Sequence, residues 1–327
     1  MKGYPDVRLR RLRRTAGMRR LLDEPVPGPE CFMWPVFVTP GRRVREPIEA
    51  MPGQCRMSVD RLCGVLEPVL KQGIGSVLLF GLVEESAKDG EGSAAWDPDG
   101  AVQRGVTAIK ARFPDVVVAT DVCLCAYTSH GHCGPVNEGG DVDNDAALAR
   151  LARVALSHAV AGADIVAPSA MMDGQVRAIR EALDEARATD TAILSYSTKF
   201  ASAMYGPFRD AERSAPGSGD RLGYQASYRN PRLARRESAL DEAEGADMLM
   251  VKPALFYLDV LSRLRGSTDL PLAAYNVSGE YSMLIAAAER GWGDLPAMAR
   301  EALCAIRRAG ADVIVSYWAS RYREVFA

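Results

Sequence analysis

The sequence predicts an α/β fold, a (β/α)8 TIM barrel with an extended N-terminal arm. Short apolar runs rich in β-branched residues alternate along the chain with stretches of helical periodicity, which is typical of parallel strands buried on both faces. Eight such runs are candidate strands: Trp34–Val38, Ser76–Leu82, Val116–Leu124, Asp164–Pro168, Ala192–Tyr196, Met248–Val251, Pro271–Tyr275 and Asp312–Tyr317. Eight βα units favour a closed barrel, and a doubly wound open sheet is the alternative arrangement.

A short internal repeat supports the alternation of helices and strands. Ala161–Asp164, Glu244–Asp247 and Ala309–Asp312 share the sequence Gly-Ala-Asp, each time between a helical stretch and an apolar run. Glycine at this place is the usual left-handed stop of a helix. Before the first repeat, one face of the expected helix carries Leu148, Leu151, Val154, Ala155 and His158.

Composition places the chain among ordinary globular proteins. It has 327 residues, of which 48% are hydrophobic and 25% charged, and its formal net charge of −2 gives no excess that would favour nucleic acid. No apolar run approaches the roughly 18 residues of a membrane span, and the N-terminus lacks the apolar core of a secretory signal. The odd cysteine count of seven is typical of a reduced chain. We therefore expect a cytoplasmic protein with no membrane or nucleic-acid partner.

The pattern divides the chain into an arm, residues 1–30, and a barrel domain, residues 31–327. The arm has little apolar periodicity and carries Arg8, Arg10, Arg11, Arg13, Arg14, Arg19 and Arg20. It is either a solvated tail or a grip on a neighbouring subunit; no aromatic residue lies among the arginines to stack on bases. Residues 200–235 are rich in Gly, Pro, Ser and Arg. Such a long irregular segment in a compact domain is typical of an active-site lid.

Three cysteines within eleven positions form the first candidate site. Cys123 and Cys125 are two apart at the end of an expected strand, so both side chains point to one face, and a glycine-flanked turn can bring Cys133 back to them. Three thiolates suit Zn²⁺ and leave a fourth position open, as in catalytic sites. Buried or redox-active cysteines are the alternative. His132 is either a ligand or, more in keeping with its place, a neighbour that orients the ligands.

Two lysines form the second candidate site, in a chain with six lysines and 34 arginines. Lys199 and Lys252 each end an expected strand, where barrel active sites are built. Apolar neighbours and a second nearby cation both lower the pKa of an ammonium, which leaves a neutral amine able to form a Schiff base with a ketone or aldehyde. A lysine ion-paired at the barrel rim is the alternative for each.

Polar residues of the lid and of two further strand ends can bind a substrate. In the lid, four side chains are suited to this: Tyr205, Arg209, Arg221 and Gln225. The two arginines can clamp a carboxylate through paired hydrogen bonds, or they belong to a solvated lid. Ser278 comes just after one expected strand and Tyr317 ends another, and each can donate a hydroxyl hydrogen bond to another carboxylate.

At these residues the sequence resembles the porphobilinogen synthase family, also called 5-aminolaevulinate dehydratase. The resemblance spans nearly the whole chain and includes the Arg-rich start, Phe37–Val38, Arg45–Ile48, Met51–Gly53, Cys123–Cys133, Ala167–Ser169, Met171–Gly174, Ser195–Phe200, Tyr205–Arg209, Gly219–Arg221, Met250–Pro253, Val277–Gly279 and Tyr317. It implies a hydro-lyase that condenses two 5-aminolaevulinate molecules into porphobilinogen, with loss of two waters, on the way to haem. It also implies a TIM barrel whose arms embrace neighbours in a homo-octamer.

The resemblance also assigns roles. Lys252 would form the Schiff base with the substrate that becomes the propionate half, and Lys199 would bind the other substrate, with Asp121 and Ser169 beside it. The three cysteines match the zinc-type members. The remaining assignments are the second substrate's carboxylate on Arg209 and Arg221, the first substrate's carboxylate on Ser278 and Tyr317, and an allosteric Mg²⁺ on Glu237.

Three positions depart from the family pattern. Ala170 stands where the family usually has Asp, Gln175 where it has Arg, and Gly223 where it tends to have Thr or Cys. Two other functions are therefore weighed. A class I aldolase or related Schiff-base lyase on the same barrel explains one lysine but not the cysteine loop. A catalytically silent regulatory paralogue is favoured only by Ala170 and Gln175.

Overall fold

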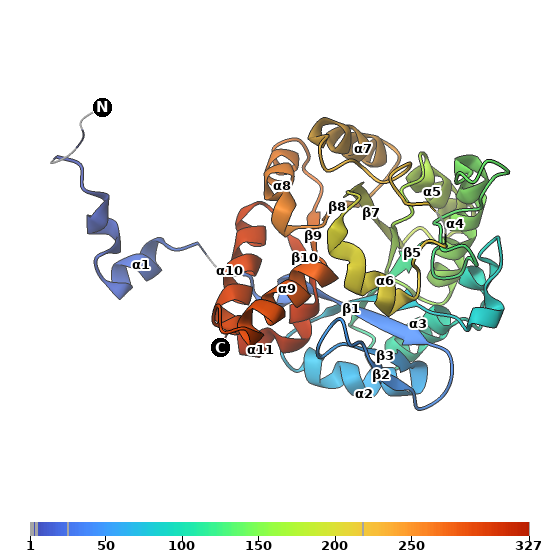
Figure 1. The fold of residues 1–327 in the computed structure, drawn as a ribbon, viewed down its shortest axis with the longest axis horizontal. Helices are drawn as coiled ribbons and strands as arrows, with labels where there is room; N and C mark the ends of the chain where they lie inside the picture. The colour runs from blue at the N-terminus through green and yellow to red at the C-terminus, as the bar shows by residue number, and fades with distance from the viewer. Residues whose placement is uncertain (1–2, 4–5, 25, 218, 327) are drawn as a thin grey trace.

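The computed structural model describes residues 3, 6–24, 26–217 and 219–326, and it contains a closed parallel barrel (Figure 1). The strands follow the order β10-β9-β8-β7-β6-β5-β4-β1, and pairing of β10 with β1 closes the ring. Their bounds are β1 Phe32–Thr39, β4 Ser76–Gly81, β5 Val117–Val122, β6 Ile165–Pro168, β7 Ala192–Lys199, β8 Met248–Lys252, β9 Leu272–Asn276 and β10 Val313–Ser316. The predicted (β/α)8 barrel is confirmed, and the open sheet is wrong.

Two short strands extend the sheet beside β1. β2 Arg45–Pro47 and β3 Cys55–Ser58 pair in antiparallel fashion, and β3 runs parallel to the last residues of β1. The pattern of apolar runs did not indicate them, because β2 has no buried residue. β7 is also longer than expected, since it continues past Tyr196 to Lys199.

The Gly-Ala-Asp repeat stabilises the end of the barrel at which the strands begin. Gly162, Gly245 and Gly310 have positive φ angles of 101°, 102° and 117°, as expected for helix stops. The aspartate that follows each glycine accepts a hydrogen bond from a backbone N–H of the preceding strand of the barrel. The three pairs are Val118 with Asp164 at 2.7 Å, Ile193 with Asp247 at 2.7 Å and Leu272 with Asp312 at 2.9 Å. The repeat therefore joins neighbouring strands as well as ending helices.

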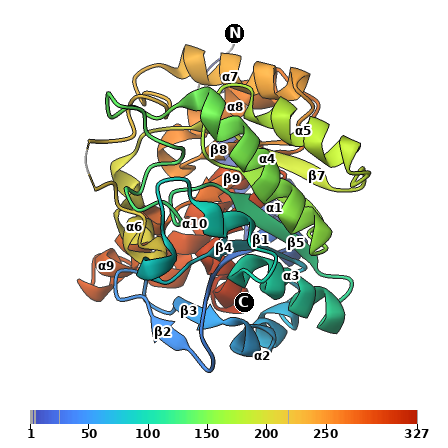
Figure 2. The ribbon, with the colours of Figure 1, turned by 90° about the vertical axis from the view of Figure 1, so that its right-hand side faces the viewer.

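Helices form the outer layer around the barrel (Figures 1 and 2). They are α2 Val59–Leu70, α3 Ala101–Arg112, α4 Asn144–Val160, α5 Gln175–Glu185, α7 Pro231–Ala243, α8 Leu258–Arg265, α9 Ser278–Glu289, α10 Leu295–Arg308 and α11 Tyr322–Phe326. On α4 the expected face is buried at Leu151, Val154, Ala155 and His158, and Leu148 is half-buried. The apolar stripe of α4 thus packs against β5 and β6 of the barrel.

The segment 200–235 is less irregular than its composition indicated. It contains the 3-10 turn Ala203–Tyr205, α6 Gly206–Glu212 and the beginning of α7. The Arg56 side chain anchors the end of α6, because its Nε donates to Ala211 O at 2.8 Å and its guanidinium to Asp210 O at 2.6 Å. The Phe208 ring packs against Phe37 and Phe80 of the barrel, with centroids 5.7 and 5.1 Å apart. The segment therefore lies over the barrel mouth.

The N-terminal segment lies apart from the barrel (Figure 1). It contains a 3-10 turn, Leu9–Arg13, and α1 Ala16–Leu22, and neither has a buried residue. The barrel end of this segment is fixed at Pro27, whose carbonyl accepts a hydrogen bond from Tyr322 Oη at 3.1 Å. Among the described residues, no helix is long and apolar enough to cross a membrane.

Replacing Gly279 by Ala should destabilise the contact between the lid and α9. A Cβ at this position would lie 2.5 Å from Met204 O, so the backbone of one of the two segments must move. We expect a loss of about 1–3 kcal/mol in the free energy of unfolding, measured by denaturant titration.

Gly64 offers a matched control, for which replacement by Ala should raise the free energy of unfolding instead of lowering it. It is exposed within α2, and a Cβ there would meet nothing within 4 Å. Gly64→Ala should stabilise the protein by about 0.5–1 kcal/mol. If the Gly279→Ala variant and the parent had the same free energy of unfolding, the backbone at Met204 could move without destabilising the protein, which would contradict this prediction.

Candidate active site

The two lysines lie side by side at the end of the barrel where the strands end. Lys199 is the last residue of β7 and Lys252 the last of β8, and they are partners in the parallel register of the two strands. Lys252 is only 3% exposed. Its Nζ lies near the centroids of five aromatic rings: Tyr275 at 4.3 Å, Phe208 at 4.7 Å, Tyr196 at 4.9 Å, Tyr205 at 5.5 Å and Phe80 at 6.0 Å.

This enclosure makes Lys252 a candidate nucleophile. Burial, together with the positive charge of Lys199, lowers the pKa of Lys252 to about 7, against the opposing effect of the Asp121 and Glu212 carboxylates. Half of the amine is then neutral at pH 7, whereas an unperturbed lysine is almost fully protonated. A neutral amine can attack a carbonyl carbon. Lys252 therefore has the environment that Schiff-base chemistry requires.

Lys199 is held by the neighbouring strand end. Its Nζ donates a hydrogen bond to Ser169 O at 2.5 Å, just beyond β6, and lies 5.7 Å from the Tyr196 ring. Asp121, near the end of β5, has a buried Oδ1 with no hydrogen-bond partner in the protein. Burial, together with the Glu212 charge, raises the pKa of Asp121 to about 7. The predicted grouping of Lys199, Asp121 and Ser169 is thus present.

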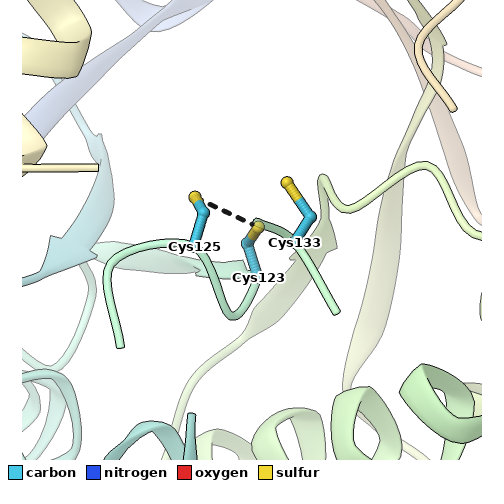
Figure 3. A group of neighbouring side chains, drawn as sticks. All are labelled: Cys123, Cys125 and Cys133. Atoms are coloured by element: carbon cyan, nitrogen blue, oxygen red, sulfur yellow. Dashed lines mark hydrogen bonds between the residues drawn. The ribbon is translucent and has the colours of Figure 1, made fainter. Parts of the chain in front are cut away.

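The three cysteines converge beside this pair (Figure 3). Their Sγ atoms lie within 4.8 Å of one another, Cys123 and Cys125 are 3.4 Å apart, and all three are buried as free thiols. Cys123 and Cys125 lie in the turn after β5 rather than in the strand. Gly131, with a φ of 73°, helps the chain turn back to Cys133, as expected.

The donor set fits a soft divalent metal ion. Hydrogen bonds from Cys123 and Cys125 lower the pKa of Cys133, and the Arg221 and Lys199 charges act in the same direction. One thiolate is therefore favoured even before a metal binds. Three converging sulfurs with one position left over match catalytic zinc sites. Among the described residues, no other group of three or more His, Cys, Asp and Glu side chains has its ligand atoms within 4.8 Å of one another.

His132 is a neighbour of the cysteines rather than a member of the group. Its Nδ1 lies 3.2 Å from the Tyr224 hydroxyl, which in turn hydrogen-bonds Cys133. Its carbonyl accepts from Thr128 Oγ1 at 2.9 Å, which closes the cysteine loop. His132 is therefore placed to orient Cys133 through Tyr224.

The lid residues expected to bind a substrate surround the same region, and several have polar atoms without a protein partner. The buried atoms without a partner are Arg209 Nε, Arg221 Nε and both amide atoms of Gln225. The Arg221 guanidinium already donates to Gly131 O at 2.9 Å and Ser214 O at 2.6 Å, so it also fixes the lid against the cysteine loop. Buried polar atoms without a partner are costly, which indicates that a ligand completes them.

The remaining residues expected to bind a substrate are Tyr205, Tyr317 and Ser278. The Tyr205 hydroxyl donates to Phe200 O at 2.7 Å and lies 3.3 Å from Lys252 O, and the Tyr205 ring lies 5.5 Å from Lys252 Nζ. Tyr317 shares a 3.0 Å hydrogen bond with Tyr275, whose ring is the nearest of the five to Lys252 Nζ. Ser278 is buried at the beginning of α9, with Oγ 3.4 Å from Met204 O.

Comparison with known proteins decides the family. The family model described as Delta-aminolevulinic acid dehydratase matches residues 6–325. The chain belongs to the delta-aminolevulinic acid dehydratase family. The enzyme of that name from Archaeoglobus fulgidus is 50% identical over 324 residues, which are 99% of each chain, and the one from Bacillus subtilis is 46% identical over 312 residues, 95% of each.

A solved structure of the family has the same fold. The delta-aminolevulinic acid dehydratase (porphobilinogen synthase) of Toxoplasma gondii ME49, in complex with the reaction product porphobilinogen, superimposes with a TM-score of 0.95. It is 44% identical, and the match covers 97% of this chain and 91% of that one. Membership of this hydro-lyase family over nearly the whole length disfavours both the class I aldolase and the silent paralogue.

The departures from the family pattern are accommodated inside the fold. Ala170 is buried, and Gln175, the first residue of α5, accepts a hydrogen bond from Met172 N at 3.4 Å.

Glu237 is half-buried on α7 and lines a cavity of about 790 Å³ together with Asp173, Gln225 and His132. Burial, together with the Asp173 charge, raises the pKa of Glu237. The Mg²⁺ site at Glu237 stays a prediction.

The sequence analysis did not identify one buried residue of this region, Glu212. Glu212 ends α6, is 3% exposed and lies 3.4 Å from Cys125 Sγ through its Oε2. Nothing in the sequence distinguishes it from the other charged residues of a polar lid, because its burial depends on how α6 packs over the barrel.

Reaction of Lys252 with a small ketone should follow a titration with a midpoint near pH 7. Below this pH the ammonium predominates and cannot attack, and above it the neutral amine predominates, because burial lowers the pKa of Lys252 to about 7. Trapping of the imine by cyanoborohydride, quantified at Lys252 by peptide mass spectrometry, measures the midpoint.

Two variants sharpen this measurement. Lys199→Met should move the midpoint to higher pH, because it removes a positive charge that disfavours the ammonium. Lys71→Gln changes an exposed lysine at the end of α2, which is ion-paired with Glu67, and should leave the profile unchanged. A midpoint near 10 in the parent would contradict the lowered pKa of Lys252, and absence of any adduct at Lys252 would contradict its assignment as the nucleophile.

Proposed function

We propose that this chain is a porphobilinogen synthase that condenses two molecules of 5-aminolaevulinate, with loss of two waters, through lysine Schiff bases beside a catalytic Zn²⁺. The observation that carries the proposal is the pair of amines at Lys199 and Lys252, one of them with a pKa near 7, next to three converging cysteines. Family membership supplies the substrate class.

Lys252 is proposed to bind the first substrate. Its neutral amine attacks the ketone carbon, and the carbinolamine then loses water to give the imine. The aromatic rings around Nζ exclude bulk water and disfavour the charged amine before substrate arrives. Ser278 and Tyr317 are proposed to bind its carboxylate; both are buried, and the Tyr317 hydroxyl is hydrogen-bonded to Tyr275.

Lys199 is proposed to bind the second substrate on the side of the cysteines. Asp121, with a buried Oδ1 that has no partner and a pKa raised to about 7 by burial, can exchange a proton with the reacting amine near neutral pH. Arg209, Arg221 and Gln225 carry the unpartnered buried atoms that suit the second carboxylate. The two substrates thus have separate sets of polar groups.

Zn²⁺ is the cofactor that the cysteine group favours. Cys123, Cys125 and Cys133 would hold it, and when bound it supplies Lewis-acid polarisation of a substrate oxygen or nitrogen. The sulfur ligands favour zinc over Mg²⁺, which prefers oxygen. A Mg²⁺ ion at Glu237 is proposed separately as an allosteric site, supported only by the half-buried carboxylate beside Asp173.

The proposed setting is a cytoplasmic homo-octamer joined through the N-terminal arms. The arm carries exposed leucines, Leu9, Leu12 and Leu21, and none of its described residues in the 3-10 turn or α1 is buried in the chain itself. Apolar side chains on a segment that cannot form its own core are typical of a surface that another subunit covers.

Incubation with 5-aminolaevulinate should yield porphobilinogen, detected by its colour reaction with an aldehyde reagent. Chelation should abolish the product and Zn²⁺ should restore it, because three thiolates alone provide no Lewis acid. Cys125→Ala should lower activity at least a hundredfold, whereas Cys304→Ala, a half-buried cysteine on α10, should not. Full activity after removal of all metal would contradict the zinc proposal.

Deletion of residues 1–24 should reduce the molar mass in solution by light scattering, because the arm would no longer reach a neighbour. The deletion keeps Pro27, which is bonded to Tyr322 in the barrel. A full-length variant with Leu9, Leu12 and Leu21 replaced by Ser should show the same reduction without loss of chain length. An unchanged mass in both would leave the arm as a solvated tail.

A further inference from the structure

Glu280 is a fully buried carboxylate on α9, two residues after Ser278. Its exposed fraction is 0%, although glutamate is rarely buried completely unless it is paired. Its Oε1 accepts a hydrogen bond from Leu255 N at 2.7 Å, and its Oε2 accepts one from Val277 N at 3.0 Å. The carboxylate therefore bridges the backbone of two segments, one that follows β8 and one that follows β9.

Two buried side chains extend this bridge to β10. Asn276, the last residue of β9, donates its Nδ2 to Glu280 Oε2 at 3.1 Å and accepts a hydrogen bond from Ser316 Oγ at 3.0 Å. Asn276 and Ser316 are also partners in the parallel register of β9 and β10, and each is 0% exposed. Ser316 Oγ in turn accepts from Trp318 N at 3.2 Å. One network of buried hydrogen bonds thus joins three neighbouring strand ends.

These strand ends carry the three residues that are proposed to bind the first substrate. Lys252 comes three residues before the first backbone donor to Glu280, and Ser278 directly follows the second donor. Tyr317 directly follows Ser316. A buried polar network whose groups all have partners makes its surroundings rigid. The spacing between the Lys252 amine and the two hydroxyls therefore depends on the network around Glu280.

Capping of α9 alone does not account for these contacts. A carboxylate in the first turn of a helix is favoured by the helix dipole, and the hydrogen bond from Val277 N is of this local kind. The bonds from Leu255 and Asn276 are not needed for a cap, and the first of them reaches 25 residues along the chain. Glu280 thus holds parts of the active site together as well as beginning a helix.

We propose that Glu280 is a positioning residue for the first substrate, which sets the distance between the Lys252 amine and the hydroxyls of Ser278 and Tyr317. The inference rests on the proposed function, which assigns those three residues to that substrate. It adds a reason for selectivity: the network fixes the spacing between the group that binds a ketone and the groups that bind a carboxylate. A keto acid of matching length is then preferred over a simple ketone.

Trapping of the imine at Lys252 with two ketones tests this without the complete reaction. One is 4-oxopentanoate, which has the ketone and the carboxylate of 5-aminolaevulinate but no amine, and the other is pentan-2-one, which has no carboxylate. The measurement is made near pH 8, above the pKa of about 7 to which burial lowers Lys252 and raises Glu280. In the parent the keto acid should have an apparent affinity at least about tenfold higher, because its carboxylate accepts hydrogen bonds.

Glu280→Gln keeps the shape of the side chain but turns an amide toward backbone donors. It should remove most of the preference for the keto acid, about tenfold, while trapping of pentan-2-one stays within about twofold of the parent. A merely structural role would instead weaken both reactions equally. Glu289→Gln, which changes an exposed glutamate at the end of the same helix, should match the parent with both ketones.

Ser316→Ala provides a second, milder variant, because it removes only the hydroxyl that joins Asn276 to Trp318. It should also reduce the preference for the keto acid and leave pentan-2-one unaffected. An unchanged preference in both variants, or an equal loss with both ketones in both variants, would overturn the role of Glu280. A parent that forms the adduct at Lys252 equally well with both ketones would instead contradict the proposed carboxylate site, and with it this inference.

Discussion

The parallel register between β7 and β8 is the constraint on which the rest of the site depends. It sets Lys199 opposite Lys252, and a shift in the pairing between Ser195 and Thr198 precedes this pair. Two amines forced together at the end of neighbouring strands cannot both stay charged in an enclosed space without compensation. The aromatic rings and the lid bury Lys252, which favours its neutral form, and the nearby carboxylates act in the opposite direction.

The lid keeps Lys252 away from water and so favours its neutral amine over the ammonium. Phe208 packs on Phe37 and Phe80 and places its ring 4.7 Å from Lys252 Nζ, while Arg56 fixes the end of the same helix. One short helix therefore removes water from Lys252 at one end and brings Glu212 to Cys125 at the other. Access for the substrates and the electrostatics of the lysine are coupled through this element, because opening the lid would rehydrate the amine.

The sequence predicts the barrel because its periodicities are local: eight apolar runs, and Gly-Ala-Asp stops confirmed by positive φ angles at Gly162, Gly245 and Gly310. The lysines and cysteines were found because rare residue types stood at strand ends, and the structure brings them together. Local pattern cannot show how α6 packs. The pattern indicates neither the bond from Arg221 to Gly131 nor the contact of Glu212 with Cys125, because both join segments far apart in sequence.

Burial shifts the pKa values of Lys252 and Asp121 in opposite directions, and this allows proton transfer between them. Burial lowers the pKa of Lys252 to about 7 and raises the pKa of Asp121 to about 7, and each carries the charge of the other among its causes. When ordinary values of about 10.4 and 3.9 converge, a proton can move between amine and carboxylic acid at little cost near neutral pH. Imine formation needs this, because the amine must be free to attack while an acid remains to release water. The fold thus sets both requirements by enclosing the two groups together. The apolar neighbours of Lys252 indicate its lowered pKa, whereas the local sequence around Asp121 does not indicate a raised one.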